Sequence, residues 1–160
     1  MSVAVLVTSD GHVFSGRAFG AIGEVVAPAL IDASVADYSR VLSMGESEGK
    51  IAVFTSPHIG NVGLPAPFEP LARGVVVREA SRIASNWQSQ GELEPALRAA
   101  GVVGIEGIDT RALVKLLVQK PDLRVGIFSG AVIDSHGLEE GERTPRDLVK
   151  CLQNRVKGAN

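Results

Sequence analysis

Short apolar runs separated by turn residues predict that the chain begins with β-strands. Residues 3–8 are mostly β-branched, Asp10 and Gly11 provide a turn signal, and the extended pattern resumes at residues 12–14. Two extended runs joined by an Asp-Gly turn are typical of an antiparallel hairpin. Residues 19–23 contain two glycines and are predicted to form a second turn.

Further strands are predicted where apolar residues recur without helical spacing. Pro28 interrupts the first of these runs and marks an edge or a bulge, because proline has no backbone N–H to donate to a sheet. Val75, Val76 and Val77 form a continuous apolar run, which is typical of a strand covered on both faces and therefore central in its sheet. These predicted strands cover residues 24–31, 50–55, 73–78 and 124–128.

Apolar residues at helical spacing predict several helices. Gly101 fits the position just past a helix end, and Asp109 is well placed to cap the helix that follows it. In that helix, residues 112, 113, 116 and 117 form one apolar stripe, whereas residues 111, 115 and 119 lie off it. The predicted helices cover residues 34–44, 91–100 and 110–119, and a last segment from Thr144 with Leu148, Val149, Leu152 and Val156 facing inward.

The connecting segments and the length of the chain indicate one domain. Residues 56–70 contain four prolines and two glycines, too many breakers for a helix or a central strand, and are predicted to form a long ordered loop. Residues 135–143 are polar and expected to be exposed. No internal repeat is present, and 160 residues fall within the usual size of one domain. We therefore expect a single domain over residues 1–160, with mixed α and β structure and both parallel and antiparallel strand pairs.

Composition and charge narrow the possible partners. The formal net charge is -2, without a basic cluster, so nucleic acid and anionic membranes are not expected partners. The longest apolar runs are far too short to cross a bilayer. Cys151 is the only cysteine and cannot form an intramolecular disulfide, and the first residues lack the positive region of a signal peptide. A cytoplasmic location is therefore expected.

A glycine-containing segment leads directly into the helix predicted at residue 110. Gly104 and Gly107 precede a helix amino terminus, where backbone amides often bind phosphate. Asp109, however, would place its carboxylate on the same amides, and no lysine of a Walker-type motif follows. We favour a tight turn with an N-cap, and a ligand site at this turn stays open as an alternative.

The remaining reactive side chains predict no catalytic, cofactor or metal site. Cys151 lacks the glycine-flanked turn and the neighbouring histidine that activate a nucleophile, so a buried or bystander thiol is expected. Ser129 does not fit a nucleophile elbow and is expected at a strand end. Trp87 is interpreted as a core residue or an interface anchor. The histidines at positions 12, 58 and 136 lack the spacing of a metal pair, and the acidic residues at 46, 48, 139, 140 and 142 are expected to be solvated.

Several short motifs follow one another in a distinctive order between residues 6 and 127. The strongest is Gly-Ile-Asp-Thr-Arg-Ala-Leu at residues 107–113. The others are Asp10-Gly11, Phe14-Ser15-Gly16, Phe19-Gly20-Ala21, Gly23-Glu24, Tyr38, Pro57, Ile59-Gly60-Asn61, Gly63, residues 74–79, Ser85-Asn86-Trp87 and residues 104–106. Each motif alone is weak, but the ordered series resembles the amino-terminal domain of the carbamoyl-phosphate synthase small subunit.

The resemblance implies a fold and a role. The implied fold is α/β, a swivelling β/β/α three-layer domain with mixed parallel and antiparallel sheets. In that family the small subunit hydrolyses glutamine and passes ammonia to a large synthetase subunit, in a pathway serving arginine and pyrimidine synthesis. The hydrolytic residues belong to an amidotransferase domain that follows this one, so no catalytic residue is assigned here. The implied partners are the large subunit and the amidotransferase domain.

Candidate interface or structural residues follow from the matching motifs. They are Tyr38, Asn61, Arg78, Asn86, Trp87, Asp109, Thr110 and Arg111. Two segments, residues 33–49 and 64–72, depart from the family pattern and are candidate surface segments, because loops carry specificity while the core carries the fold. A non-catalytic domain supporting carbamoyl phosphate formation is therefore the first hypothesis. A diverged stand-alone interaction module, with a homo-oligomer as one form, is the alternative.

Overall fold

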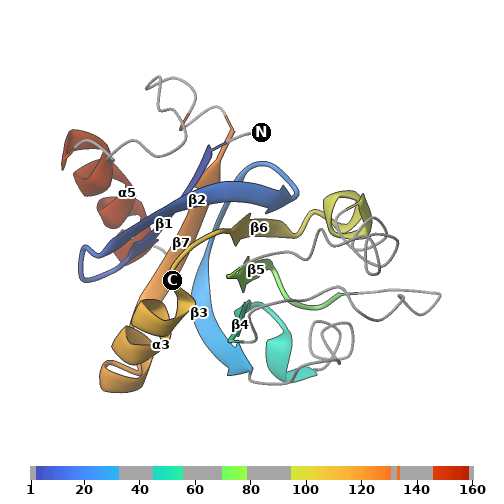
Figure 1. The fold of residues 1–160 in the computed structure, drawn as a ribbon, viewed down its shortest axis with the longest axis horizontal. Coiled ribbons are helices and arrows are strands. Elements are labelled where there is room, and N and C mark those ends of the chain that lie inside the picture. The colour runs from blue at the N-terminus through green and yellow to red at the C-terminus, as the bar shows by residue number, and fades with distance from the viewer. Residues whose placement is uncertain are drawn as a thin grey trace.

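The computed structural model describes residues 3–32, 45–55, 70–78, 95–130, 133 and 146–158. Residues 95–100 are helical, and Figure 1 shows how the elements are arranged. In chain order the elements are β1 (Val3–Thr8), β2 (Val13–Gly20), β3 (Glu24–Asp32), the 3-10 helix η1 (Gly45–Ser47), β4 (Ile51–Phe54), β5 (Gly74–Val77), β6 (Val103–Glu106), α3 (Thr110–Gln119), β7 (Arg124–Ser129) and α5 (Arg146–Gly158).

The strands form one closed sheet with the order β1-β2-β6-β5-β4-β3-β7, in which β7 also pairs with β1. Strands β3, β4, β5 and β6 run parallel to one another. The remaining pairs, β1 with β2, β2 with β6, and β7 with both β1 and β3, are antiparallel. The predicted mixture of α and β structure with both kinds of strand pairing is confirmed. Because the two kinds of pairing join in one closed sheet, the described residues do not confirm separate layers.

The opening hairpin is confirmed. Strands β1 and β2 pair antiparallel, and Gly11 between them has a positive φ of 95°. The Thr8 amide donates to the His12 carbonyl oxygen at 2.9 Å, which closes the turn. Strand β2 is longer than predicted and continues to Gly20, so the turn expected at residues 19–23 begins later.

Strand β6 lies where the sequence predicts part of a glycine-containing turn before the helix at residue 110. All four of its residues, 103–106, are instead buried and pair with β2 and β5. Gly104 explains the difference, because a Cβ at this position would collide with the Phe19 carbonyl oxygen of β2 and lie 2.7 Å from Val75 Cγ1. The glycine therefore serves close strand packing, and only Gly107, with a φ of 83°, makes the turn.

Strand β3 connects the two parts of the sheet. Its first half pairs antiparallel with β7 as far as Pro28, and its second half, from Ala29, pairs parallel with β4. Pro28, where an edge or a bulge was predicted, is exposed and lies where β3 changes partner. Strand β5 is buried along its whole length between the parallel strands β4 and β6, which confirms its predicted central position.

Alternation along the strands separates two core clusters. One cluster contains Ala4 and Leu6 of β1 together with Leu113 and Leu117 of α3, which confirms the apolar stripe predicted for that helix. The other side of β1 packs against α5, because Val3, Val5 and Val7 form a cluster with Leu148, Leu152 and Val156. The predicted inward face of the last helix is confirmed at these three positions, and Val149 is half-buried.

Some predicted elements fall outside the described residues. These are the helix at residues 34–44, the loop at 56–69, the start of the helix at 91–100 and the polar segment 135–143. The end of the helix at residue 100 is described, and Gly101 follows it with a φ of 75°, as predicted. Within the described ranges, no helix has both the length and the apolar content needed to cross a bilayer.

Candidate functional site

The carboxyl ends of three parallel strands meet at one edge of the sheet. Thr55 follows β4, Arg78 follows β5, and Gly107 follows β6. Helix α3 begins at the same edge, directly after Asp109. Ligands in α/β proteins commonly bind at the carboxyl ends of parallel strands, because the loops and helix amino termini gather there. A binding site is therefore expected at this edge.

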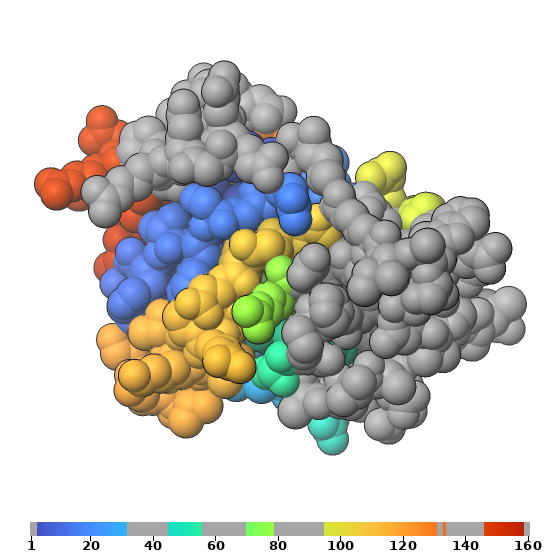
Figure 2. Space-filling model, viewed as in Figure 1, coloured from blue at the N-terminus to red at the C-terminus, as the bar shows by residue number. Residues whose placement is uncertain are grey.

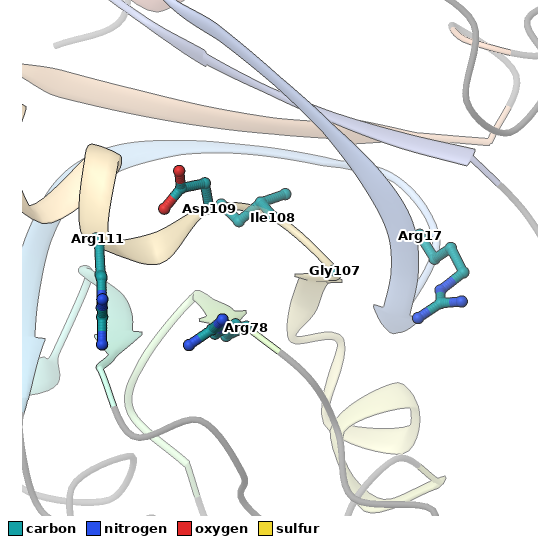
Figure 3. Close-up of a pocket in the computed structure, with 6 residues that line it drawn as sticks. All are labelled: Arg17, Arg78, Gly107, Ile108, Asp109 and Arg111. Atoms are coloured by element: carbon teal, nitrogen blue, oxygen red, sulfur yellow. The ribbon is translucent and has the colours of Figure 1, made fainter.

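Two cavities lie at this edge and have Arg111 in common. The larger measures ≈ 520 Å³ and the smaller ≈ 340 Å³. Arg17, Arg78, Gly107, Ile108, Asp109 and Arg111 line the larger cavity (Figure 3), and Thr55, Thr110, Arg111, Val114 and Lys115 line the smaller. We call these two cavities together the arginine site.

The turn between β6 and α3 is held at both of its ends. The Gly107 amide donates to the Arg78 carbonyl oxygen at 2.9 Å, which ties the turn to the end of β5. Asp109 Oδ1 accepts a hydrogen bond from the Ala112 amide at 3.2 Å, so the predicted N-cap is confirmed. The Asp109 carboxylate thereby occupies an amide that an anion at the helix terminus would use. An anion at this site would therefore compete with Asp109 for the Ala112 amide but not for the arginine side chains.

Arg17, which lines the larger cavity, forms an ion pair with the buried Glu106. Glu106 is 1% exposed, and its Oε1 lies 3.2 Å from Nε of Arg17, which is 30% exposed. A buried carboxylate requires such a partner, because removing its hydration without compensation is costly. Arg17 was not among the residues predicted from the sequence. It comes from β2, and only the pairing of β2 with β6 places it beside Glu106.

Arg78 and Arg111 give the site its excess positive charge. Both side chains are exposed, and neither forms an ion pair with an acidic residue in the described part of the chain. In Figure 3 the two guanidinium groups lie on the same side of the turn, whereas the Asp109 carboxylate points away from them. The arrangement offers two arginine heads to an incoming acidic group.

Four of the eight residues predicted from the family motifs meet at this site. Arg78, Asp109 and Arg111 line the larger cavity, and Thr110, which is 1% exposed, lines the smaller one with Arg111. Tyr38, Asn61, Asn86 and Trp87 lie outside the described residues. The role of all eight residues at an interface stays a prediction.

A second polar cluster connects the opening hairpin to the end of α3. Asp10 Oδ1 lies 2.8 Å from His12 Nδ1 and also accepts from the Thr8 hydroxyl, while Lys120 Nζ donates to Asp10 Oδ2 at 2.9 Å. Burial acts to raise the pKa of Asp10, but the hydrogen bonds from Thr8, His12 and Lys120 outweigh it and hold that pKa well below its usual range. The His12 ring bonds to Asp10 rather than to the Thr8 hydroxyl, so this is a clasp between elements rather than a nucleophile with its base.

The other reactive residues have simple structural roles. Ser129 ends β7, as predicted, and its hydroxyl accepts from the Gly23 amide at 3.1 Å and donates to the Gly23 carbonyl oxygen at 3.2 Å. Cys151 is exposed on α5, so of the two expected alternatives, a buried or a bystander thiol, the buried one is wrong, because the helix turns residues 148, 152 and 156 inward instead. Among the described residues, no group of three His, Cys, Asp or Glu side chains is arranged to hold a metal ion.

Comparison with known proteins places the chain in a family. Residues 6–127 match the model of the carbamoyl-phosphate synthase small chain, CPSase domain. The chain is 39% identical over 163 aligned positions to the carbamoyl phosphate synthase small chain of Streptomyces avermitilis, covering 98% of this chain and 40% of that protein. It is 41% identical over 148 positions to that of Streptomyces coelicolor, covering 89% of this chain and 39% of that protein.

The chain therefore belongs to the carbamoyl-phosphate synthase small chain family and contains its CPSase domain. It spans about 40% of the length of these curated relatives. A solved aminopeptidase from Aneurinibacillus sp. strain AM-1 aligns with a TM-score of 0.45 at 14% identity, covering 81% of this chain and 30% of that chain. At these values the aminopeptidase supports no conclusion about this chain.

Proposed function

We propose that this chain is the non-catalytic amino-terminal domain of a glutamine-dependent carbamoyl-phosphate synthase small subunit. In this role it supports an amidotransferase domain and contributes to association with the large subunit. The observation that carries the proposal is the match of residues 6–127 to the CPSase domain of the small chain. Relatives that align with nearly the whole chain bear the same name, which supports the proposal further.

The proposal includes the setting of that function. A subunit of this enzyme serves carbamoyl phosphate formation in the cytoplasm, for arginine and pyrimidine synthesis. The domain is proposed to extend over residues 1–160 as one unit of the swivelling β/β/α type. In the closed sheet, β3 joins an antiparallel part to a parallel part, and this mixture of pairings is compatible with that fold type.

Association with the cognate large chain tests the proposal directly. The purified chain is titrated with the large chain, and complex formation is followed by analytical ultracentrifugation. We expect a complex of defined stoichiometry, and no ammonia release from glutamine by the chain alone. A Cys151→Ser variant, which lacks the exposed thiol, should bind equally and so excludes capture through a disulfide.

The same experiment can contradict the proposal. A chain that is folded by circular dichroism but forms no complex at any attainable concentration of the large chain would refute a role in subunit association. Self-association without binding of the large chain would favour a stand-alone interaction module. Glutamine hydrolysis by the purified chain would refute its non-catalytic assignment.

A further inference from the structure

We infer that the arginine site is a docking site for an acidic segment of a partner protein, whose carboxylates are bound by Arg78 and Arg111. The inference rests on the proposed function, which supplies the large chain as that partner. It goes further by naming the surface of this domain that makes the contact and the chemistry that the partner must present there.

The charge at the site favours an acidic occupant. Arg17 is paired with the buried Glu106, and the Asp109 carboxylate is turned to the Ala112 amide. Arg78 and Arg111 therefore present positive charge that no acidic side chain in the described ranges neutralises. Guanidinium groups bind carboxylates through two parallel hydrogen bonds, and arginine is enriched at protein interfaces. Two exposed arginines on one cavity wall are thus suited to a carboxylate pair.

The position of the two arginines is fixed by the fold. The Arg78 carbonyl oxygen accepts a hydrogen bond from the Gly107 amide, so the end of β5 is joined to the turn before α3. Arg111 is the second residue of α3. It follows Thr110, which is 1% exposed and anchors the capped start of the helix. Side chains on such rigid elements lose less entropy on binding than side chains on loose loops. The backbone that carries the two arginines is therefore preorganised for binding.

The shape of the site favours an extended segment over a small free anion. Two cavities of ≈ 520 Å³ and ≈ 340 Å³ share Arg111, and Lys115 on the next turn of α3 lines the second. Cationic side chains at positions 78, 111 and 115 thus follow one another along the carboxyl edge of the sheet. Figure 2 shows the β5 region, in green, and the β4 region, in teal, reaching the surface beside the start of α3. An acidic peptide segment carries several carboxylates along its length and is therefore suited to cations that line two cavities, whereas a single small anion is suited to one.

Alanine variants test the inference through the affinity for the large chain. Arg78→Ala and Arg111→Ala should each weaken binding roughly tenfold or more, because a close charge pair across an interface is lost. Arg146→Ala removes an equal charge from an exposed position on α5, which packs on β1 and β7, and should leave the affinity unchanged. Raising the salt from about 50 to about 500 mM should weaken the unaltered chain more than the double variant Arg78→Ala/Arg111→Ala.

Zero-length crosslinking identifies the occupant independently of affinity. A carbodiimide joins an amine to a carboxylate only when the two are in contact. Lys115 should therefore couple to an Asp or Glu of the large chain, as located by peptide mass spectrometry. The Lys115→Arg variant keeps the charge but lacks the amine, so the same crosslink should disappear.

The outcomes separate the inference from the proposed function. If the unaltered chain binds the large chain and both arginine variants bind equally well, the inference is overturned while the proposed function stands. If Lys115 couples only to a second copy of this chain, the inference is likewise overturned. If the unaltered chain forms no complex at all, the proposed function fails and the inference fails with it.

Discussion

Replacing Asp10 by asparagine tests whether the clasp between the opening hairpin and α3 stabilises the fold. The Asp10 carboxylate accepts from the Thr8 hydroxyl, His12 and Lys120, and its side chain is 18% exposed. A hydrogen bond to a charged group contributes about 1.5–3 kcal/mol when buried. The Lys120 and His12 side chains are 56% and 50% exposed, so their contacts with Asp10 add at most about 1 kcal/mol together. We expect Asp10→Asn to lower the free energy of unfolding by about 2 kcal/mol at neutral pH.

The pH dependence of this loss is a sharper measurement than its size. The pKa of Asp10 is lowered in the folded chain, so its contribution is fully present above the unfolded pKa of about 3.9 and decreases as the pH falls toward the folded pKa. At about pH 3 the difference between the two proteins should therefore shrink by about 1 kcal/mol. Urea denaturation followed by circular dichroism, at about pH 7 and about pH 3, measures both differences.

Two results would refute this reasoning. Equal stability of the two proteins at neutral pH would show that Asp10 bonds as well with solvent as with its three neighbours. A difference that does not change with pH would show that the loss comes from altered packing rather than from the charge. Lys120→Gln serves as the control, because it removes only the exposed arm of the clasp and should cost about 0.5 kcal/mol or less.

Two further substitutions test other parts of the fold. Gly104→Ala should destabilise the chain by about 1–3 kcal/mol, because a Cβ there collides with the neighbouring strands. Gly45→Ala, with open space around it, should be nearly neutral. Thermal unfolding compares the two variants, and equal melting temperatures would contradict close packing at β6. Arg17→Ala should lower the free energy of unfolding by about 2 kcal/mol or more, because the buried Glu106 loses its ion pair with Arg17. Adding Glu106→Gln should recover part of that loss, as measured by urea denaturation. No recovery would mean that the loss comes from packing rather than from charge.

Elements whose periodicity is local were predictable from the sequence. The apolar stripe and the Asp109 cap defined α3, and the valine run at residues 75–77 defined the central strand β5. Each of these signals lies within one element, so the structure that it predicts does not depend on contacts with distant parts of the chain. Strand β6 was missed because Gly104 has the same appearance in a turn as in a strand that a neighbour approaches closely. That distinction depends on β2, which lies far away in the sequence.

Some residues of the candidate site could also be predicted from local motifs, and others could not. Arg78, Asp109 and Arg111 belong to motifs that can be read along the chain, and all three line one cavity. Arg17 and Glu106 come from different strands, so their ion pair follows only from the pairing of β2 with β6. The closure of the sheet is another such property, because it requires β7 to pair with two strands near the start of the chain. A single sequence contains no local signal for this closure.

The double pairing of β7 has a consequence for how the chain is made. On a ribosome, β1 to β6 emerge before residues 124–129, and until then β1 and β3 each have an edge without its final neighbour. Open edges of this kind promote pairing between chains. The nascent chain is therefore most exposed to aggregation just before β7 emerges, and a stop codon before residue 124 would release a protein with two unprotected edges rather than a smaller stable barrel.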